Sequence, residues 1–538
     1  MLMHKNIKLL DCTLRDGGYN NDWEFGNDAL INIYERSLSS GVDTIEVGFI
    51  DDRRGFDKNR SIMPDTASVR KIWGNIDKGK TQVVAMIDYG TCDISRLEPR
   101  KDSYVDGIRV IFKMELMHEA LAYCAKVKEL GYMVFAQGVS FTTYTEEKLA
   151  EIVGLLNNLK PHAFAIVDTY GLMDINIINH YYSYLDTHLE KSISIGFHAH
   201  NNFQLAFANC MELARRHGNN PRPLLLDGSI YGMGKGAGNA PLELLITFMN
   251  ENYGTKYDIN PILEAIDVNI LDLHKQLNWG YSLKSFIAAS NDCHPNYVSY
   301  LLNKKTLSVK SINEILQRIT LKTAKLHYNK NAIEQLYIDY QKNSLNDGSD
   351  YAKLSNELGG RSLLLIGPGK SVLHEKKAIA AYIEKENPIV VSINFIPERF
   401  NVDFLFITNS KRYVQQSSAI NNVARKPKII ATSNVTKAMG NFDFVLDYEA
   451  LIDRNAVFID NSFIMALKVM IKTSVKSAAL AGFDGYSLSS ESDYFLSKME
   501  YEFSKRMGQD INTYVNATLA EIKTKLNIQF ITPTLYNF

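Results

Sequence analysis

Cysteine is scarce in this chain of 538 residues, and its spacing excludes the common cysteine motifs. An odd number of scattered cysteines, with no Cys-x-x-Cys pair, does not build a disulfide scaffold and is typical of a reducing compartment. The first residues, MLMHKNIKLLDCT, contain no hydrophobic signal-peptide segment. The sequence therefore predicts a cytoplasmic protein. The five cysteines are Cys12, Cys92, Cys124, Cys210 and Cys293.

The chain also lacks a surplus of charge and a long apolar run. Lys and Arg together number 59 and Asp and Glu number 60, so the formal net charge is −1. This balance argues against a nucleic-acid-binding surface and against an anionic membrane as a partner. No stretch approaches the roughly 18 uncharged apolar residues that a membrane span requires. We expect neither nucleic acid nor a membrane among the partners.

Histidine and cysteine are both absent from residues 375–538, because the last of the 12 histidines is His374 and the last cysteine is Cys293. Chemistry that requires imidazole or thiolate must therefore lie in the first two thirds of the chain. The chain of 538 residues is also too long for a single domain, since domains usually span about 100–200 residues.

Eight short apolar segments alternate with helix-compatible segments over the first 230 residues or so. Near-continuous hydrophobicity is typical of parallel strands that are covered on both faces. Helices are expected at 115–131 and at 145–159, the latter with Thr145 as N-cap. This pattern and size favour a (β/α)₈ TIM barrel, although a doubly wound open sheet has the same alternation. The expected strands are 7–13, 43–49, 81–87, 106–112, 132–138, 163–168, 193–199 and 223–229.

The remaining chain divides into three further parts. We predict a barrel domain at 1–254, a helical extension at 255–341, a polar linker at 342–361 with Asn-Asp-Gly and Gly-Gly breakers, and a Rossmann-like α/β domain at 362–538. In the extension, 308–320 is an expected helix. In the last domain, strands are expected at 361–366, 388–395, 402–408, 427–433, 443–448 and 456–460, and helices at 461–482 and 492–508.

The segment GFHAHNN (196–202) ends the seventh expected strand and is the strongest local signal for chemistry. Residues i and i+2 of a strand point to the same face, so His198 and His200 would project together. Two adjacent imidazoles at a strand end suit a divalent metal ion with open positions. The alternative is a pair of strand histidines that only form hydrogen bonds.

Two other segments end expected strands. DCTLRDGGY (11–19) offers Asp16 as a carboxylate ligand and Arg15 as a guanidinium that stabilises an oxyanion, although Arg-Asp-Gly-Gly is also a common turn. DGSIYGMGKGAGNAPLELL (227–245) is glycine-rich and offers Asn239 as an oxygen ligand. In a closed barrel the first, seventh and eighth strands are neighbours, so Asp16, His198, His200 and Asn239 would converge at the carboxyl-terminal mouth.

TLRDGG, GFHAHNN and GMGKGAGN together resemble the DRE-TIM metallolyases, a family that includes 4-hydroxy-2-oxovalerate aldolase, hydroxymethylglutaryl-CoA lyase and isopropylmalate synthase. The resemblance covers about residues 7–250. Residues 255–325, including WGYSLKSF (279–286) and HPNYVSYLL (294–302), are similar to the extension of the oxovalerate aldolase branch.

The resemblance implies a set of site residues. Asp16, His198 and His200, with Asn239, would bind Mn²⁺ or Mg²⁺, and Arg15 would bind an enolate oxygen. Glu46, Arg109, Asp168 and Tyr281 would line the substrate pocket; for the first three, a barrel-interior ion pair is the alternative.

The reaction implied is the cleavage or formation of a 4-hydroxy-2-oxo acid through a pyruvate-type enolate, by an aldol mechanism. The small-molecule partners would be a 2-oxo acid and an aldehyde, and the protein would be a homo-oligomer. The oxovalerate aldolases have a histidine three residues after the metal aspartate, where this chain has Tyr19. A tyrosine with a pKa near 10 is a poor base at pH 7. The alternatives are a Claisen-type acyl-CoA synthase or lyase on the same barrel, and a catalytically impaired metal-binding scaffold.

IGPGKS (366–371) lies between an expected strand and a helix, where a Rossmann-like fold binds phosphate. The full G-x-G-x-x-G motif is missing, so a nucleotide or phosphate ligand and a simple tight turn are both open interpretations.

Overall fold

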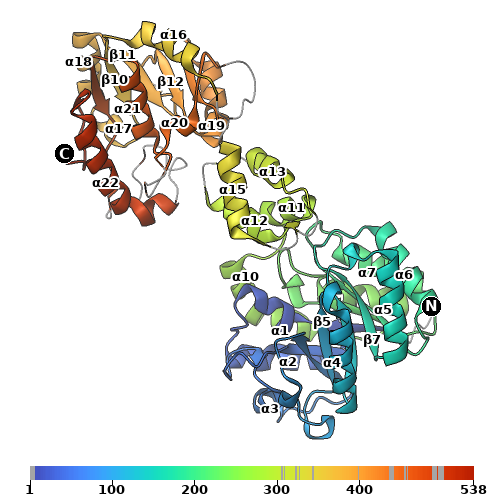
Figure 1. Cartoon of the computed structure of the whole chain (residues 1–538). Coiled ribbons are helices and arrows are strands. Elements are labelled where there is room, and N and C mark those ends of the chain that lie inside the picture. The colour runs from blue at the N-terminus through green and yellow to red at the C-terminus, as the bar shows by residue number, and fades with distance from the viewer. Residues whose placement is uncertain are drawn as a thin grey trace. The chain divides into compact units, whose positions relative to one another are not determined.

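The structure is a computed structural model, and it divides into two compact units, Met1–Pro295 and Asn296–Phe538 (Figure 1). It describes residues 6–304, 307, 309–321, 324–325, 328–341, 345–397, 399–435, 442–453, 456, 459–487, 494 and 502–537.

The first unit is a closed barrel of parallel strands, which confirms the predicted (β/α)₈ fold. The first strand pairs with both the second and the last, so the sheet has no open edge within the ring. The short strand β3 (Ile62–Met63) pairs only with the outer end of β2. The eight barrel strands are β1 (Ile7–Asp11), β2 (Thr44–Ile50), β4 (Gln82–Asp88), β5 (Gly107–Phe112), β6 (Met133–Gly138), β7 (Ala163–Asp168), β8 (Ser194–Ala199) and β9 (Leu224–Gly228).

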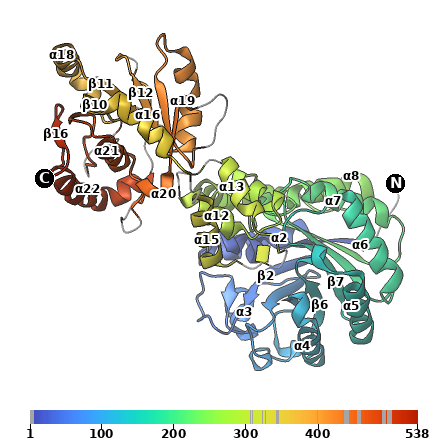
Figure 2. The ribbon, with the colours of Figure 1, turned by 45° about the horizontal axis from the view of Figure 1, so that its top comes forward.

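These strands form where the sequence is apolar on both faces, and every residue of β2, β7, β8 and β9 is buried. Helices cover the outside of the ring (Figures 1 and 2). The hydroxyl of Thr145 accepts a hydrogen bond from the Lys148 amide at 3.3 Å, as the predicted N-cap requires. The helices of this layer are α2 (Asn27–Ser40), α3 (Thr66–Trp73), α4 (Met117–Glu129), α5 (Glu146–Leu159), α6 (Ile175–His188), α7 (Ala206–His217) and α8 (Leu242–Tyr253).

The helices that follow the barrel belong to both units. The first unit continues with α9 (Asn260–Ala265), α10 (Leu271–Leu277) and α11 (Leu283–Ser290), whereas α12 (Pro295–Asn303), α13 (Val309–Gln317) and α15 (Lys330–Gln341) lie in the second unit. The extension predicted at 255–341 is therefore divided near Pro295. Across the described ranges, no helix is long and apolar enough to cross a membrane.

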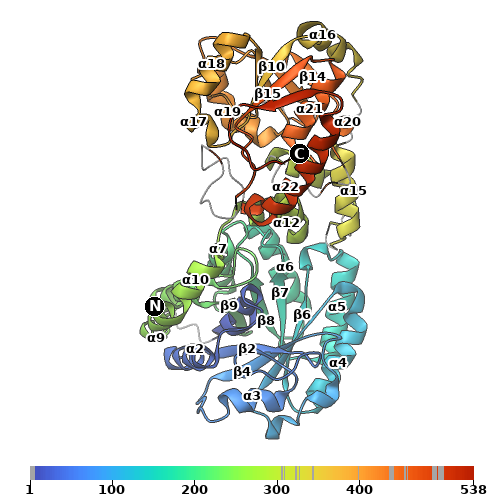
Figure 3. The same cartoon turned by 90° about the vertical axis from the view of Figure 1, so that its left-hand side faces the viewer.

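The second unit contains a seven-stranded parallel sheet in the order β14-β13-β12-β11-β10-β15-β16, consistent with the predicted Rossmann-like domain. Figure 3 shows α17–α19 on one side of this sheet and α20–α22 on the other. Its strands are β10 (Ser362–Ile366), β11 (Ile389–Ile393), β12 (Phe404–Ile407), β13 (Lys428–Thr432), β14 (Phe444–Leu446), β15 (Ser477–Ala481) and β16 (Asn527–Phe530). Its helices are α16 (Gly348–Leu358), α17 (Ser371–His374), α18 (Lys376–Glu386), α19 (Ser410–Asn422), α20 (Tyr448–Leu451), α21 (Ser462–Lys472) and α22 (Glu502–Ile522).

The linker predicted at 342–361 is wrong over α16, which is part of the second core. Tyr351, Leu354 and Leu358 lie on one helical face and are buried in that core. The Asp350 carboxylate also accepts a hydrogen bond from the Val445 amide of β14 at 2.9 Å. The polar residues that suggested a linker are the outer face of an amphipathic helix.

The helix predicted at 461–482 is also wrong in its second half. The helix α21 ends at Lys472, Ser474 adopts a left-handed conformation with φ 55°, and β15 follows beside β10 in the centre of the sheet. The Ala- and Leu-rich sequence of β15 favours a helix locally, but burial on both sheet faces overrides that propensity. Parts of the predicted strand 456–460 and helix 492–508 lie outside the described residues, although α22 includes the end of the latter.

Candidate metal centre

The short helix α1 (Thr13–Asp16) follows β1 directly and places Arg15 and Asp16 inside the barrel mouth, where both are buried. The turn after it requires glycine, because a Cβ at Gly18 would lie 2.0 Å from the Trp23 ring. The Trp23 indole donates to the Arg15 carbonyl at 2.8 Å and fixes the start of the loop. The glycines of the Arg-Asp-Gly-Gly segment thus allow the chain to fold tightly beside the two charged residues.

The two histidines lie at the end of β8, with ring centroids 5.1 Å apart. His198 Nδ1 lies 3.0 Å from the Asp227 carboxylate of β9. A neutral imidazole donates its Nδ1 proton to that carboxylate, which leaves the lone pair on Nε2. His200 follows the strand and forms an isolated bridge with Asn239.

Asp16, His198 and His200 converge, with one ligand atom of each within 4.8 Å of the others. His198 Nε2, His200 Nδ1 and Asn239 Oδ1 are buried and have no hydrogen-bond partner among the described residues. A buried unpaired polar atom costs about 1–3 kcal/mol, and such atoms around one carboxylate suit a bound cation. The donor set of imidazole, carboxylate and amide oxygen fits a divalent metal ion.

The glycine-rich loop after β9 closes over Asp16. Asp16 Oδ2 accepts from the Asn239 amide nitrogen at 2.7 Å and from the Lys235 backbone amide at 3.2 Å. A Cβ at Gly234 would lie 2.4 Å from Asn239 Nδ2 and 2.6 Å from Asp16 Oδ2. Glycine at this position therefore permits the close approach of the loop.

A chain of buried ion pairs connects the cluster to the barrel interior. Arg15 donates to Asp16 at 2.5 Å and to Glu46 at 2.8 Å. Arg109 in turn donates to Glu46 at 2.9 Å and to Asp227. Glu46 and Arg109 thus form buried ion pairs that contact Arg15 and Asp227, and their place in the substrate pocket stays a prediction.

The electrostatic environment prepares the cluster to bind a cation. Burial alone would raise the pKa of Asp16, but Arg15 and the two histidines hold it well below its usual range. Burial lowers the pKa of His200 to about 4. Near pH 7, Asp16 is therefore a carboxylate and His200 is a neutral imidazole, which are the forms that ligate metal ions.

Asp168 is buried at the end of β7, but its oxygens accept from the Leu172 and Met173 backbone amides at 2.9 and 3.1 Å. Burial raises its pKa to about 6 despite these bonds. Its position is that of a loop anchor. Tyr281 is 64% exposed and lies just before α11, and its place in the substrate pocket stays a prediction.

Tyr19 lies at the mouth, and its ring packs against Trp23 and Phe49 at centroid distances of 4.9 and 5.9 Å. The residue is 38% exposed overall, yet loss of hydration around its hydroxyl raises its pKa far above 10. The phenol therefore stays protonated near neutral pH and can donate a hydrogen bond.

Sequence reasoning missed Asp227 and Gln137. Asp227 lies in the apolar strand β9, where an isolated buried carboxylate was the available signal. Gln137 lies on β6, and its amide oxygen, turned toward Arg109, accepts from Nε and Nη2 at 2.5 and 2.6 Å. Both residues contact Arg109 of the ion-pair chain. These contacts join different strands and can be recognised only in the folded barrel.

The IGPGKS segment of the second unit forms a tight turn between β10 and α17. The Asp484 carboxylate accepts from the Ser371 backbone amide at 2.8 Å and from its hydroxyl. An internal carboxylate thus stands where a phosphate would bind, and a nucleotide or phosphate ligand here stays a prediction.

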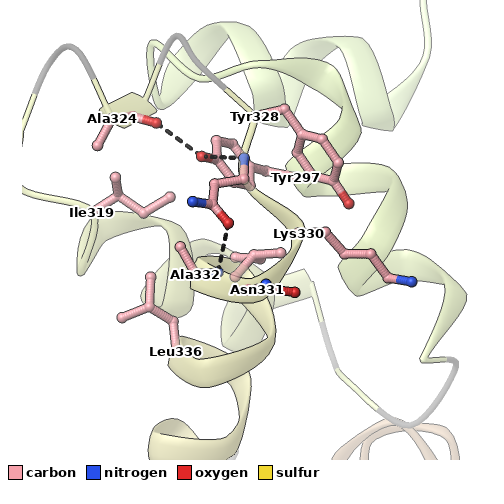
Figure 4. A pocket seen from close by; sticks show the side chains of 10 residues that line it. Tyr297, Ile319, Ala324, Tyr328, Lys330, Asn331, Ala332 and Leu336 are labelled. Carbon is pink, nitrogen blue, oxygen red and sulfur yellow. Dashed lines mark hydrogen bonds between the residues drawn. The ribbon is translucent and has the colours of Figure 1, made fainter.

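A cavity of about 630 Å³ lies among the helices of the second unit (Figure 4). The Tyr297 hydroxyl donates to the Ala324 carbonyl at 2.9 Å and accepts from the Asn329 amide at 3.0 Å. The described residues that line this cavity, among them Lys330 and Leu336, include no carboxylate, histidine or cysteine. This cavity has no evident chemistry.

About the first half of the chain is similar to known proteins. The HMGL-like family model matches residues 6–268. A 4-hydroxy-2-oxovalerate aldolase of Pelotomaculum thermopropionicum is 26% identical over 50% of this chain and 77% of its own length, and one of a Marinomonas species is 28% identical over 51% and 80%. The N-terminal domain of a Bacteroides vulgatus protein is 22% identical with a TM-score of 0.46, over 57% of this chain and 99% of that domain.

Proposed function

Because the HMGL-like family model matches residues 6–268, we propose that the protein is a divalent-metal-dependent aldolase that forms or cleaves a 4-hydroxy-2-oxo acid. The two relatives from Pelotomaculum thermopropionicum and Marinomonas are named 4-hydroxy-2-oxovalerate aldolases, which supports this reaction class. The observation that carries the proposal is the buried Asp16–His198–His200 cluster, whose ligand atoms lie within 4.8 Å of one another beside Arg15.

The charges of the centre support this substrate class. Three buried carboxylates (Asp16, Glu46 and Asp227) face two guanidiniums (Arg15 and Arg109), which leaves one net negative charge when the histidines are neutral. A divalent cation turns that balance to one positive charge, and the carboxylate of a 2-oxo acid neutralises it. Mn²⁺ or Mg²⁺ suits this mixed oxygen and nitrogen donor set.

When bound, the cation supplies Lewis acidity to the ketone and carboxylate oxygens of a 2-oxo acid. Arg15 stabilises the developing enolate oxygen: its Nε and Nη1 are held by Glu46 and Asp16, whereas Nη2 has no partner within the described chain and can donate. Because the guanidinium is already fixed, little reorganisation accompanies the reaction.

Tyr19 acts as a donor to the oxygen of the aldehyde half. Its phenol is protonated near pH 7, so it supports the carbonyl oxygen that becomes a hydroxyl during condensation. It is not the base that removes the hydroxyl proton during cleavage.

The test is exchange of the pyruvate methyl protons in D₂O with Mn²⁺, followed by NMR. Exchange reports enolate formation and needs no aldehyde. We expect exchange by the wild-type chain and its loss in His200→Ala. The matched control is His118→Ala, which removes an exposed histidine of α4 and should leave exchange unchanged. A wild-type protein that binds Mn²⁺ and exchanges no 2-oxo acid would refute the proposal.

A further inference from the structure

We propose that Lys235 and the ring of Tyr19 form a subsite at the barrel mouth for a negatively charged group, a carboxylate or a phosphate, on the aldehyde half of the substrate. This inference rests on the proposed function, because it names the substrate class of the same centre. It assigns a specificity-determining role to a lysine that the ligand cluster itself does not require.

The position of Lys235 connects the cluster to the mouth. Its backbone amide donates to Asp16 Oδ2 at 3.2 Å, while its ammonium lies 5.0 Å from the centroid of the Tyr19 ring. The backbone of Lys235 therefore contacts Asp16, the proposed metal ligand, while its side chain extends over Tyr19. An aldehyde that reacts beside the enolate must lie within reach of this side chain.

The ring of Tyr19 is itself held in place. It packs against Trp23, at 4.9 Å, and Phe49, at 5.9 Å, and these two rings contact each other at 5.4 Å. A cation over such a ring is attracted by the negative face of the π system. The aromatic group thus keeps the ammonium at the mouth and limits water on one side of it, which strengthens its attraction for an anion.

Lys235 is exposed, and its ammonium makes no salt bridge within the described ranges. Of the acidic groups at the mouth, Asp51 is already bound by Arg53 through bonds of 2.8 and 2.6 Å. Asp88 interacts with Arg53, Lys113 and Lys235 at once. The Asp88 carboxylate is therefore shared among three cations, which leaves the exposed Lys235 ammonium able to attract a substrate anion.

The charged group takes no part in bond making. In condensation, a C–C bond forms between the enolate carbon and the aldehyde carbon, and the aldehyde oxygen takes one proton to become a hydroxyl. Cleavage reverses these changes, and neither direction involves an oxidation. Lys235 would therefore act through binding and orientation of the aldehyde, and its effect should lie mainly in KM.

The experiment measures condensation of pyruvate with three aldehydes in the presence of Mn²⁺: succinic semialdehyde, glyceraldehyde 3-phosphate and neutral propanal. We expect the wild type to favour one or both anionic aldehydes, and their relative kcat/KM tells the carboxylate from the phosphate. Lys235→Gln should lower kcat/KM for the favoured anion by about twofold to fivefold, the range of one exposed ion pair, and change propanal much less.

Two further variants make the result specific. Lys235→Arg keeps the positive charge and should retain most of the preference. Lys80→Gln makes the same charge change at an exposed position before β4, at the opposite end of the barrel, and should not alter it. Equal losses for anionic and neutral aldehydes, or a wild type without anionic preference, would overturn the inference. If the wild-type protein did not exchange the methyl protons of pyruvate, the proposed function itself would be refuted.

Discussion

At the scale of single residues, the centre depends on a carboxylate outside the ligand cluster. The Asp227 carboxylate accepts a hydrogen bond from His198 Nδ1 at 3.0 Å and also pairs with Arg109. It thereby fixes the tautomer and ring orientation of His198 and ends the ion-pair chain that positions Arg15. Groups that orient a ligand in this way commonly change metal affinity by about 10- to 100-fold when they are replaced.

We expect Asp227→Asn to weaken Mn²⁺ binding by about 10- to 100-fold, because an amide does not hold the imidazole tautomer as a carboxylate does. Isothermal titration with Mn²⁺ measures the change, and circular dichroism verifies the fold. Asp272→Asn, on the exposed surface of α10, is the matched control. Equal affinity in Asp227→Asn and the wild type would show that His198 is oriented without this carboxylate.

The residue scale also shows what the sequence could and could not predict about the site. Asp16, His198 and His200 were predictable because strand ends of a closed barrel meet at one mouth, and the structure brings them together. Their role as ligands stays a prediction. Asp227 was missed because its function depends on contacts with neighbouring strands. Tyr281 is exposed, and its place at the pocket, which rested on the resemblance alone, stays a prediction.

At the scale of elements, the loop after β9 requires glycine at position 234. Gly234 lies so close to Asp16 and Asn239 that a Cβ would approach both within 2.6 Å. We expect Gly234→Ala to displace the loop and lower Mn²⁺ affinity by about tenfold or more, in a protein that remains folded. Gly154→Ala, on the exposed side of α5 with open space around it, should retain affinity and stabilise the helix by about 0.5–1 kcal/mol. Titration and thermal unfolding of both variants test this contrast.

The loop after β7 has a pH-dependent anchor in Asp168, whose pKa is raised by burial from 3.8 to about 6. Folding therefore favours the protonated carboxyl. Its stabilising contribution is complete below about pH 3.8 and is lost as the pH rises through about 6. Relative to Asp168→Asn, we expect the unfolding free energy of the metal-free wild type to fall by up to about 3 kcal/mol between about pH 4 and pH 7.

Urea unfolding of the two proteins at several pH values measures this difference, and other titrating groups cancel in the comparison. A constant difference between wild type and Asp168→Asn across the range would mean that the carboxyl has an ordinary pKa in the folded protein.

Most elements were predictable for one physical reason: the eight barrel strands are apolar on both faces, and this signal is local. The errors occur where tertiary contacts override a local pattern. The strand β15 has a helical composition but lies between β10 and β16, and α16 has a polar outer face that is typical of a linker. In both segments the structure is determined by contacts with elements that are distant in the sequence, so the local pattern does not reveal it.

At the scale of the whole molecule, the two units have separate cores. The large hydrophobic cluster of the barrel lies within residues 7–279, whereas the clusters around the second sheet begin at Tyr351. All the residues of the proposed centre, and Lys235, belong to the first unit. A domain with its own core can fold alone, so the activity should not require the second unit.

We therefore expect a fragment of residues 1–295 to fold and to exchange the pyruvate methyl protons at a rate within about threefold of the full chain, because the cut falls at the boundary between the two compact units. Circular dichroism establishes whether the fragment is folded, and NMR in D₂O with Mn²⁺ measures exchange. The His200→Ala form of the same fragment supplies the background rate. A folded fragment that binds Mn²⁺ but exchanges no faster than this background would place an essential group in residues 296–538, which contain neither cysteine nor, after His374, histidine.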